Sequence, residues 1–238
     1  MRVPAEPEDE SLAIGNLMHA TFERVTNAGI SNEEAVEYFL AELEKRDLEP
    51  EVKDKIREVG PAELAVSLEA FSGILRSGRA EVDLGPEHLV IDGVPVTGKI
   101  DHITVDKEAR TIEIYDFKTG KYRKDKWTSH ATLYKYAMQL MFYKMLLLAS
   151  REYRGYTISR AHILFVRPDG DGEVYDRVYE FDDEAETELR ELVGAVYGLV
   201  ESLKFMEDPE IFVPADKNLK LADIKEFIEL LLAKGAEI

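Results

Sequence analysis

The sequence predicts an α/β fold in which a mixed central sheet is flanked by helices. Three observations support this prediction. Apolar residues recur at helical spacing in the N-terminal part of the chain, and shorter segments of alternating polarity follow in the middle. A long apolar segment then separates these from two further strand-like segments. Helices before, between and after the strands therefore indicate a sheet with mixed pairing.

The N-terminal part is expected to contain three helices, which span Ser11–Ala28, Asn32–Arg46 and Pro61–Arg76. Asn32 is a suitable N-cap, because its side chain can accept a hydrogen bond from a free backbone N–H. Pro61 suits the first position of a helix, where its missing N–H leaves no hydrogen bond unmade. Residues 1–10, which are rich in Pro and Glu, are expected to be a linker or a boundary segment.

Strand-like segments follow, and Asp92-Gly93 marks a tight turn between the first two. These segments are His88–Ile91, Val94–Val105 and Arg110–Phe117. A helix from about Ala131 to Ser150 is apolar almost all round and should be buried. The remaining elements are strands at Arg160–Val166 and Val174–Phe181 and helices at Asp183–Lys204 and Leu221–Lys234. No repeat or second domain boundary is visible, so residues 1–238 are expected to form a single domain.

Two short segments of the predicted strands carry the candidate reactive side chains. They are Gly98-Lys99-Ile100-Asp101 and Asp116-Phe117-Lys118-Thr119-Gly120. Side chains alternate along a strand, so Asp116 and Lys118 should emerge on one face. Residues 106–109 are polar enough for a hairpin loop, which would place Asp101 beside Asp116 on the neighbouring strand. Two carboxylates and one ammonium group would then converge.

Paired carboxylates of this kind can hold Mg²⁺ or Mn²⁺. A bound ion neutralises charge that builds on the oxygens of a phosphodiester, and it makes a water molecule nucleophilic near neutral pH. Lys118 could orient that water, stabilise the transition-state oxyanion or act as a base, and the sequence does not choose among these roles. The alternative is that Asp116 and Lys118 form an exposed ion pair, worth roughly 0–1 kcal/mol.

His19, Gln139 and Tyr143 are further candidate site residues. His19 lies on the first predicted helix and offers an imidazole ligand, although a histidine there also suits a core or surface position. Gln139 and Tyr143 lie one helical turn apart on the same face of the apolar helix. A buried Gln needs hydrogen-bond partners, which metal-bound carboxylates, Lys118 and a phosphate group would supply. Ordinary helix packing is the alternative for this pair.

Together, these residues resemble the RecB-like branch of the PD-(D/E)XK nuclease superfamily. The resemblance rests on the ordered set His19, Gly98–Asp101, Asp116–Gly120 and Gln139-x-x-x-Tyr143. It implies a PD-(D/E)XK restriction-endonuclease-like core and a metal-dependent deoxyribonuclease. The resemblance also implies roles for single residues: His19, Asp101, Asp116 and the Phe117 carbonyl hold Mg²⁺ or Mn²⁺, Lys118 is catalytic, and Gln139 and Tyr143 support the site and the DNA.

The resemblance further implies a fused or associated helicase in DNA repair and recombination, because such domains commonly end a larger helicase of the UvrD, AddA or RecB kind. The chain departs from the family pattern at His102, where relatives often have Arg, which removes the basis for one auxiliary contact to DNA or the site. The chain also has no cysteine. We therefore expect no disulfide, no thiolate zinc site and none of the iron–sulfur clusters that some relatives bind.

The cellular location is expected to be the cytoplasm, which the lack of cysteine suits. No stretch approaches the roughly 18–20 apolar residues of a membrane span. The first residues also lack the apolar region of a signal peptide. We expect a soluble protein without a membrane partner.

The net charge of −18 opposes binding to a polyanion, because neutralisation of phosphates drives non-specific binding to DNA. Positive charge is nevertheless concentrated directly after the strand that carries Asp116. The residues there are Lys121, Tyr122, Arg123, Lys124, Lys126 and Trp127. This basic and aromatic segment could bind a phosphate backbone and stack on unpaired bases. A solvated polar loop is the alternative.

The sequence thus favours a Mg²⁺- or Mn²⁺-dependent deoxyribonuclease that acts on single-stranded DNA or DNA ends as part of a helicase–nuclease. The main alternative is a domain of the same ancestry that binds DNA or a partner subunit without cutting. An acidic protein-interaction module is a third alternative, but it would leave the residue set from His19 to Tyr143 unexplained.

Overall fold

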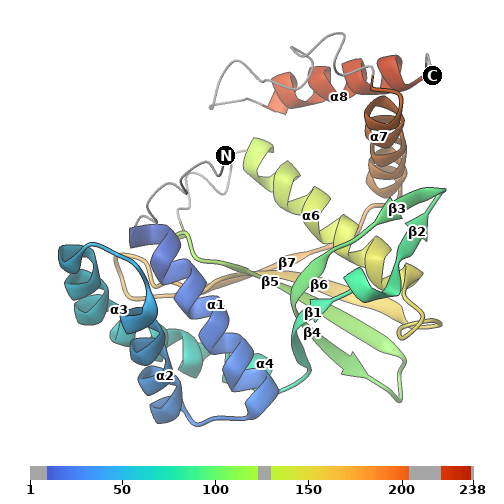
Figure 1. The fold of residues 1–238 in the computed structure, drawn as a ribbon. Coiled ribbons are helices and arrows are strands. Elements are labelled where there is room, and N and C mark those ends of the chain that lie inside the picture. Colours follow the sequence, from blue (N-terminus) through green and yellow to red (C-terminus); the bar gives the residue numbers. More distant parts are fainter. Residues whose placement is uncertain (1–9, 123–129, 204–220, 237–238) are drawn as a thin grey trace. The chain divides into compact units, whose positions relative to one another are not determined.

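The computed structural model describes residues 10–122, 130–203 and 221–236 (Figure 1). The chain divides into two compact units. The first comprises residues 1–82, 100–123 and 162–178, and the second comprises residues 83–99, 124–161 and 179–238. This division leaves the single-domain assignment of residues 1–238 a prediction. The predicted linker at residues 1–10 lies outside the described residues, apart from Glu10, which begins the first helix.

Helices of the first unit pack around one apolar core (Figure 1). They are α1 (Glu10–Ala28), α2 (Asn32–Lys45), α3 (Pro50–Ala70) and the short α4 (Ser72–Leu75). Phe22, Phe39 and Leu64 are fully buried there and come from three different helices, and Phe117 joins them from the sheet. The predicted ranges of α1 and α2 are confirmed to within one residue at each end.

The prediction that a helix starts at Pro61 is wrong, because Pro61 lies inside α3, which begins at Pro50. A proline in a helix interior costs about 3 kcal/mol, since it removes a hydrogen bond and crowds the preceding turn. Packing offsets this cost. The apolar face of the helix continues through Pro61, with Ile56 before it and Leu64 after it both fully buried. Pro50 instead occupies the first turn, where proline is tolerated.

The central sheet has five strands in the order β1-β4-β5-β6-β7. They are β1 (Arg79–Asp83), β4 (Lys99–Asp106), β5 (Thr111–Lys118), β6 (Thr157–Phe165) and β7 (Tyr175–Tyr179). β4 and β5 are antiparallel, with His102 opposite Tyr115. The C-terminal ends of β5 and β6 lie next to each other. The N–H of Val166, just after β6, donates a hydrogen bond to the carbonyl of Lys118 at the end of β5, at 3.0 Å. The predicted α/β fold with a mixed sheet is therefore confirmed.

The second unit contains a hairpin and three long helices. These are β2 (Leu89–Ile91), β3 (Val94–Val96), α6 (His130–Ala149), α7 (Asp183–Glu201) and α8 (Leu221–Gly235). At the tip of the hairpin, Asp92 and Gly93 have φ angles of 51° and 85°. A two-residue type I′ turn requires this left-handed conformation at both positions. The predicted turn is confirmed.

The predicted strand Val94–Val105 is divided into β3 and β4, which belong to different sheets. Gly98 lies at the break. A Cβ atom at this position would lie 2.5 Å from Cδ1 of Leu146, so a larger residue would require the Leu146 side chain to shift. Alternating polarity on both sides of the break looks like one continuous strand in the sequence.

The N-cap of α2 is Ser31 and not the predicted Asn32. Oγ of Ser31 accepts a hydrogen bond from the N–H of Glu34 at 3.2 Å, and the Glu34 carboxylate accepts one from the N–H of Ser31 at 2.8 Å. This reciprocal pair is a capping box. Asn32 is one residue too late for that role, and its side chain accepts a hydrogen bond from Arg76.

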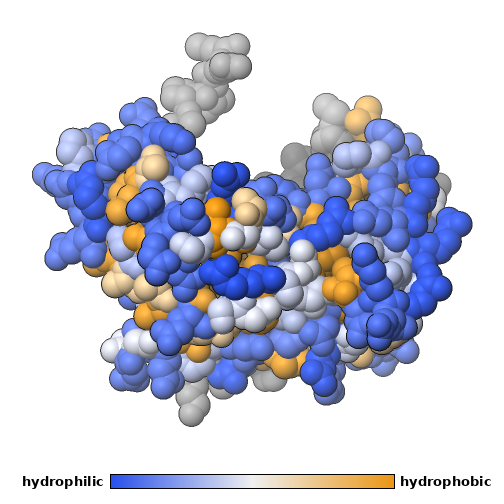
Figure 2. All heavy atoms as spheres, turned by 90° about the horizontal axis from the view of Figure 1, so that it is seen from below, coloured by the Kyte–Doolittle hydropathy of each residue, from blue (hydrophilic) through white to orange (hydrophobic). Residues whose placement is uncertain are grey.

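Hydrophilic residues cover most of the molecular face that Figure 2 shows. This agrees with a chain in which 33% of the residues are charged. Within residues 10–122, 130–203 and 221–236, none of the helices combines the length and the apolar character needed to cross a membrane.

Replacing Ser31 with alanine is expected to destabilise the protein by about 1 kcal/mol, because the capping box loses its acceptor. In a domain of this size, the melting temperature should fall by about 2–4 °C. Thermal denaturation of the Ser31→Ala variant measures the effect. The matched control is Asn32→Ala, which removes only an exposed contact. A larger loss of stability in the control would make Asn32 the effective cap.

Candidate metal centre

His19 is held in place by close packing of α1 against the end of β5. Gly15 lies one helical turn before His19, and a Cβ atom on Gly15 would lie 2.7 Å from Oγ1 of Thr119. A glycine is therefore needed for this face of the helix to approach the segment after β5. The imidazole ring packs edge-on against Phe117, with the ring centroids 5.8 Å apart. The packing of α1 thus fixes the direction of a potential ligand.

Asp101 is oriented by the neighbouring strand. Its Oδ2 accepts a hydrogen bond from the backbone N–H of Phe117 at 2.8 Å. Its Oδ1 lies 3.9 Å from Nδ1 of His19. Because one carboxylate oxygen is engaged by β5, the other is directed towards His19. The structure therefore brings Asp101 next to the end of β5, where the predicted hairpin would place it.

Glu81 of β1 is a candidate site residue that the sequence analysis missed. Its Oε1 lies 3.8 Å from Nδ1 of His19, and ligand atoms of His19, Glu81 and Asp101 all lie within 4.8 Å of one another. The three side chains are 28%, 16% and 18% exposed, respectively, so solvent reaches a group that is mostly enclosed. The only sequence signal was the apolar pair Ala80 and Val82, which alternate with polar residues as in a short strand.

Asp116 and Lys118 form a close ion pair on the same face of β5. Nζ of Lys118 lies 2.7 Å from Oδ2 of Asp116, and the two side chains are 20% and 2% exposed, respectively. This is not the exposed ion pair considered from the sequence. Burying two ions costs hydration free energy, so the pair depends on its geometry for stability. Lys118 balances part of the negative charge that Asp101 and Asp116 bring together.

The cluster favours protonated groups when no metal is bound. Burial and the charge of Asp116 raise the pKa of Asp101 from 3.8 to about 6. For His19, burial lowers the pKa, but the adjacent Glu81 carboxylate and the charges of Asp101 and Asp116 outweigh this effect and raise it. A divalent cation would displace these protons, because carboxylate and imidazole ligands bind metals in their deprotonated forms.

His102, where the sequence departs from the expected pattern, is fully buried. Its ring centroid lies 5.7 Å from that of Tyr115, and burial lowers the pKa of the imidazole to about 4. A buried, neutral imidazole is not placed to contact a DNA backbone. His102 therefore contributes to packing and not to the auxiliary contact that an arginine would make.

Gln139 and Tyr143 lie on α6 of the second unit. Nε2 of Gln139 donates a hydrogen bond to the hydroxyl of Tyr143 at 2.8 Å. The two side chains thus share one face of the helix, as their spacing requires. The expectation that this pair supports the metal site and the DNA stays a prediction.

The basic and aromatic segment is only partly described. Lys121 and Tyr122 lie within the described residues, whereas Arg123, Lys124, Lys126 and Trp127 lie outside them. The side chain of Lys121 is 50% exposed, and its Nζ lies 3.2 Å from the Glu63 carboxylate. The amine is accessible, but part of its charge is balanced within the protein.

Tyr122 is packed inside the first unit and is only 8% exposed. Its ring centroid lies 4.2 Å from that of Tyr175, and the guanidinium of Arg177 lies 4.8 Å from the ring centroid. A ring enclosed in this way is not available to stack on a base. The expectation of base stacking at Tyr122 is therefore not met in this structure.

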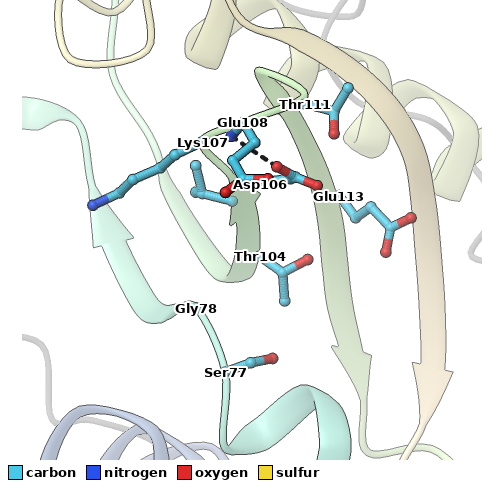
Figure 3. A pocket seen from close by; sticks show the side chains of 9 residues that line it. Ser77, Gly78, Thr104, Asp106, Lys107, Glu108, Thr111 and Glu113 are labelled. Carbon is cyan, nitrogen blue, oxygen red and sulfur yellow. Dashed lines mark hydrogen bonds between the residues drawn. The ribbon is translucent and has the colours of Figure 1, made fainter.

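A pocket of about 700 Å³ lies at the hairpin end of β4 and β5 (Figure 3). Its lining includes Thr104, Asp106 and Glu113, but none of the clustered groups described above. Asp106 is already engaged by the hairpin, because its Oδ1 accepts a hydrogen bond from the N–H of Glu108 at 2.9 Å. The candidate chemistry is therefore assigned to the cluster around Asp101 and not to this pocket.

A mixed sheet that gathers an imidazole, carboxylates and a lysine at its strand ends is suited to enzymes that cleave phosphodiesters with a divalent ion. Residues 1–215 match the PD-(D/E)XK nuclease superfamily, and the chain belongs to this superfamily. Its members are typically nucleases that hydrolyse phosphodiester bonds and generally use divalent metal ions. No significant match is found among curated proteins.

The donor set fits a divalent cation of this kind. His19 offers a nitrogen, and Glu81 and Asp101 offer carboxylate oxygens within the same small group. Carboxylate oxygens suit Mg²⁺, and a mixture of oxygen and imidazole nitrogen also suits Mn²⁺. The chain supplies no cysteine for an iron–sulfur cluster.

The contribution of Asp101 to the stability of the metal-free protein should fall as the pH rises from about 4 to about 7. The folded-state pKa of Asp101, about 6, lies above the ordinary value of 3.8. This carboxyl group therefore binds more protons in the native than in the unfolded state in this window, and the stability that it contributes decreases with pH. The raised pKa of His19 acts in the same direction at higher pH. Melting temperatures measured in chelator across the pH range test this expectation.

The matched control is Asp101→Asn, which cannot titrate. Its melting temperature should depend less steeply on pH than that of the wild type, although both proteins carry the same acidic surface. Mn²⁺ should reverse the trend in the wild type, with a larger stabilisation at pH 8 than at pH 5. Equal pH profiles for the wild type and Asp101→Asn would show that this carboxylate does not set the dependence.

Proposed function

We propose that this chain is a Mg²⁺- or Mn²⁺-dependent deoxyribonuclease in which His19, Asp101, Asp116 and the Phe117 carbonyl hold the ion. The observation that carries the proposal is the cluster of His19 with Asp101 at the end of β5, where Lys118 forms an ion pair with the buried Asp116. Membership of a superfamily of nucleases supports it.

The residues of the chain would act mainly by positioning. The bound ion would neutralise charge on the phosphate oxygens and lower the pKa of a water molecule. Asp101 is fixed by its hydrogen bond to the N–H of Phe117, and His19 is fixed by α1. Nζ of Lys118 lies 2.7 Å from Oδ2 of Asp116. From there it can orient a water molecule or stabilise negative charge in the transition state.

The proposed substrate is single-stranded DNA or a DNA end, delivered in the cytoplasm by a fused or associated helicase of DNA repair or recombination. The net charge of −18 opposes independent binding to a polyanion. Lys121 is also partly neutralised by Glu63. A linked motor would raise the effective concentration of the strand at the site. Contacts of Lys121, Arg123, Lys124, Lys126 and Trp127 with the strand, and support by Gln139 and Tyr143, are part of this proposal.

Lys118→Ala should reduce cleavage by roughly 10²-fold or more, because a group that acts in the transition state is lost. Cleavage of labelled single- and double-stranded DNA in Mn²⁺ measures the effect. The melting temperature should also be measured with Mn²⁺ present, since removal of the ammonium leaves the buried Asp116 without part of its charge compensation in the metal-free protein.

Lys121→Ala is the matched control for this experiment. It removes a neighbouring lysine that the proposal assigns to DNA binding, so affinity should fall while turnover at saturating DNA changes little. Cleavage by Lys118→Ala at the wild-type rate would reduce Asp116 and Lys118 to a structural pair. A wild type that binds Mn²⁺ and DNA without cutting either substrate would favour the non-cleaving alternative.

Mn²⁺ binding should be lost in the double variant Asp101→Asn, Asp116→Asn, because an amide oxygen is a much weaker ligand than a carboxylate. Calorimetry in metal-free buffer measures the dissociation constant. The wild type should also gain thermal stability with added Mn²⁺, whereas the double variant should not. Undiminished binding by the double variant would place the metal site elsewhere.

A further inference from the structure

Three carboxylates line the pocket at the hairpin end of β4 and β5. They belong to Asp106, Glu108 and Glu113 (Figure 3). In the described part of the chain, none of the three forms an ion pair with a lysine, arginine or histidine. Lys107 also lines the pocket, but Figure 3 shows its amine directed away from the carboxylates. The pocket therefore holds negative charge that no ion pair of the described residues balances.

The hydroxyl groups of the pocket already use their protons within the protein. Oγ of Ser77 donates a hydrogen bond to the carbonyl of Gly73 at 2.8 Å. On β5, the hydroxyl of Tyr115 donates to Oε2 of Glu113 at 2.7 Å. Tyr115 also forms a hydrogen bond with the Thr104 hydroxyl, and Thr104 must be the donor because a phenol has only one proton. Ser77 and Thr104 therefore offer lone pairs, and not protons, to a ligand.

A ligand that complements this lining carries positive charge and donates several hydrogen bonds. The guanidinium group of arginine has five N–H donors in a planar fork and no acceptor, and it binds carboxylates in a bidentate manner. A phosphate group of DNA is anionic, so the carboxylates would repel it. The volume of about 700 Å³ lies in the range of ligand sites in proteins, and it leaves room for groups beside one guanidinium.

The pocket lies beside the outermost strand on one side of the sheet. Ser77 and Gly78, which line it, directly precede β1, the first strand in the sheet order. Gly78 has a φ angle of 78°, and a Cβ atom there would clash with the carbonyl oxygen of Ile103. This wall of the pocket is thus fixed by close contact with β4. An extended segment of another chain can reach it from the sheet edge, where no further strand intervenes in the described sheet.

We propose that this pocket binds an arginine side chain from a segment of a partner protein. The inference goes beyond the proposed nuclease function, since His19, Glu81 and Asp101 do not line the pocket. The fixed wall and the placed acceptors lower the cost of ordering the site when the arginine binds. The negative charge of the pocket also steers a basic segment towards it, and salt weakens this attraction.

Titration of the isotope-labelled chain with short peptides tests the proposal. One peptide carries a single arginine, and its matched control carries citrulline, which has a similar shape but no charge. Backbone amide shifts are followed by NMR in chelator and without DNA, up to millimolar peptide. The arginine peptide should shift the amides of Thr104, Thr111 and Glu113 saturably, and it should bind roughly 10-fold more tightly than the citrulline peptide, as expected for hydrogen bonds to a charged group. Equal binding of the two peptides would overturn the proposal, and so would free arginine that binds as tightly as the peptide.

Variants of the carboxylates locate the binding site. Glu113→Gln keeps an acceptor for Tyr115 but removes the charge, so the arginine peptide should bind roughly 10-fold more weakly. Glu108→Gln, on the exposed hairpin loop, provides a second variant if the first does not fold. The matched control is Glu69→Gln, which removes an exposed carboxylate of α3 and should leave affinity within about twofold. Wild-type affinity in both pocket variants would place the peptide elsewhere. Mg²⁺ that produces the same saturable shifts at lower concentration than the peptide would make the pocket an ion site and overturn the proposal.

Discussion

The structure of the site depends on keeping two negatively charged carboxylates close together where they are partly shielded from water. Asp101 and Asp116 lie on neighbouring strands, and their mutual repulsion adds to the cost of burial. The fold counters this cost with fixed partners. The N–H of Phe117 binds Asp101, and Lys118 lies 2.7 Å from Asp116. The packing of α1 then adds His19. The free energy of core packing thereby maintains an arrangement of charges that would separate in an unfolded chain.

The elements that carry these charges could be predicted because their sequence signals are local. Alternation along β5 places Asp116 and Lys118 on one face, and the polar residues 106–109 form a hairpin that pairs β5 with β4. The left-handed turn at Asp92 and Gly93 follows from turn chemistry in the same way. In each case the side chains that decide the structure are close together in the sequence, so no knowledge of the tertiary packing is needed.

The features that escaped prediction depend on contacts between distant residues. Helix α3 continues through Pro61 because burial of its apolar face offsets the cost of the lost hydrogen bond. One apparent strand is divided into β3 and β4 at Gly98, where a Cβ atom would meet the side chain of Leu146. Glu81 lies in a strand of only five residues and reaches His19 through a backbone conformation that strand propensity does not favour. A sequence pattern shows which residues alternate in polarity. It does not show which side chains from distant parts of the chain will pack against them.

Phe117 links the core of the first unit with the site through a single residue. Its ring packs against Phe22 and the His19 imidazole, with centroids 5.2 Å and 5.8 Å away, while its backbone N–H binds Asp101. A change in the volume of this ring therefore alters the hydrophobic core and the direction of an imidazole at the same time. A substitution at this position would therefore need compensating changes in α1 that restore both the packing volume and the orientation of the histidine.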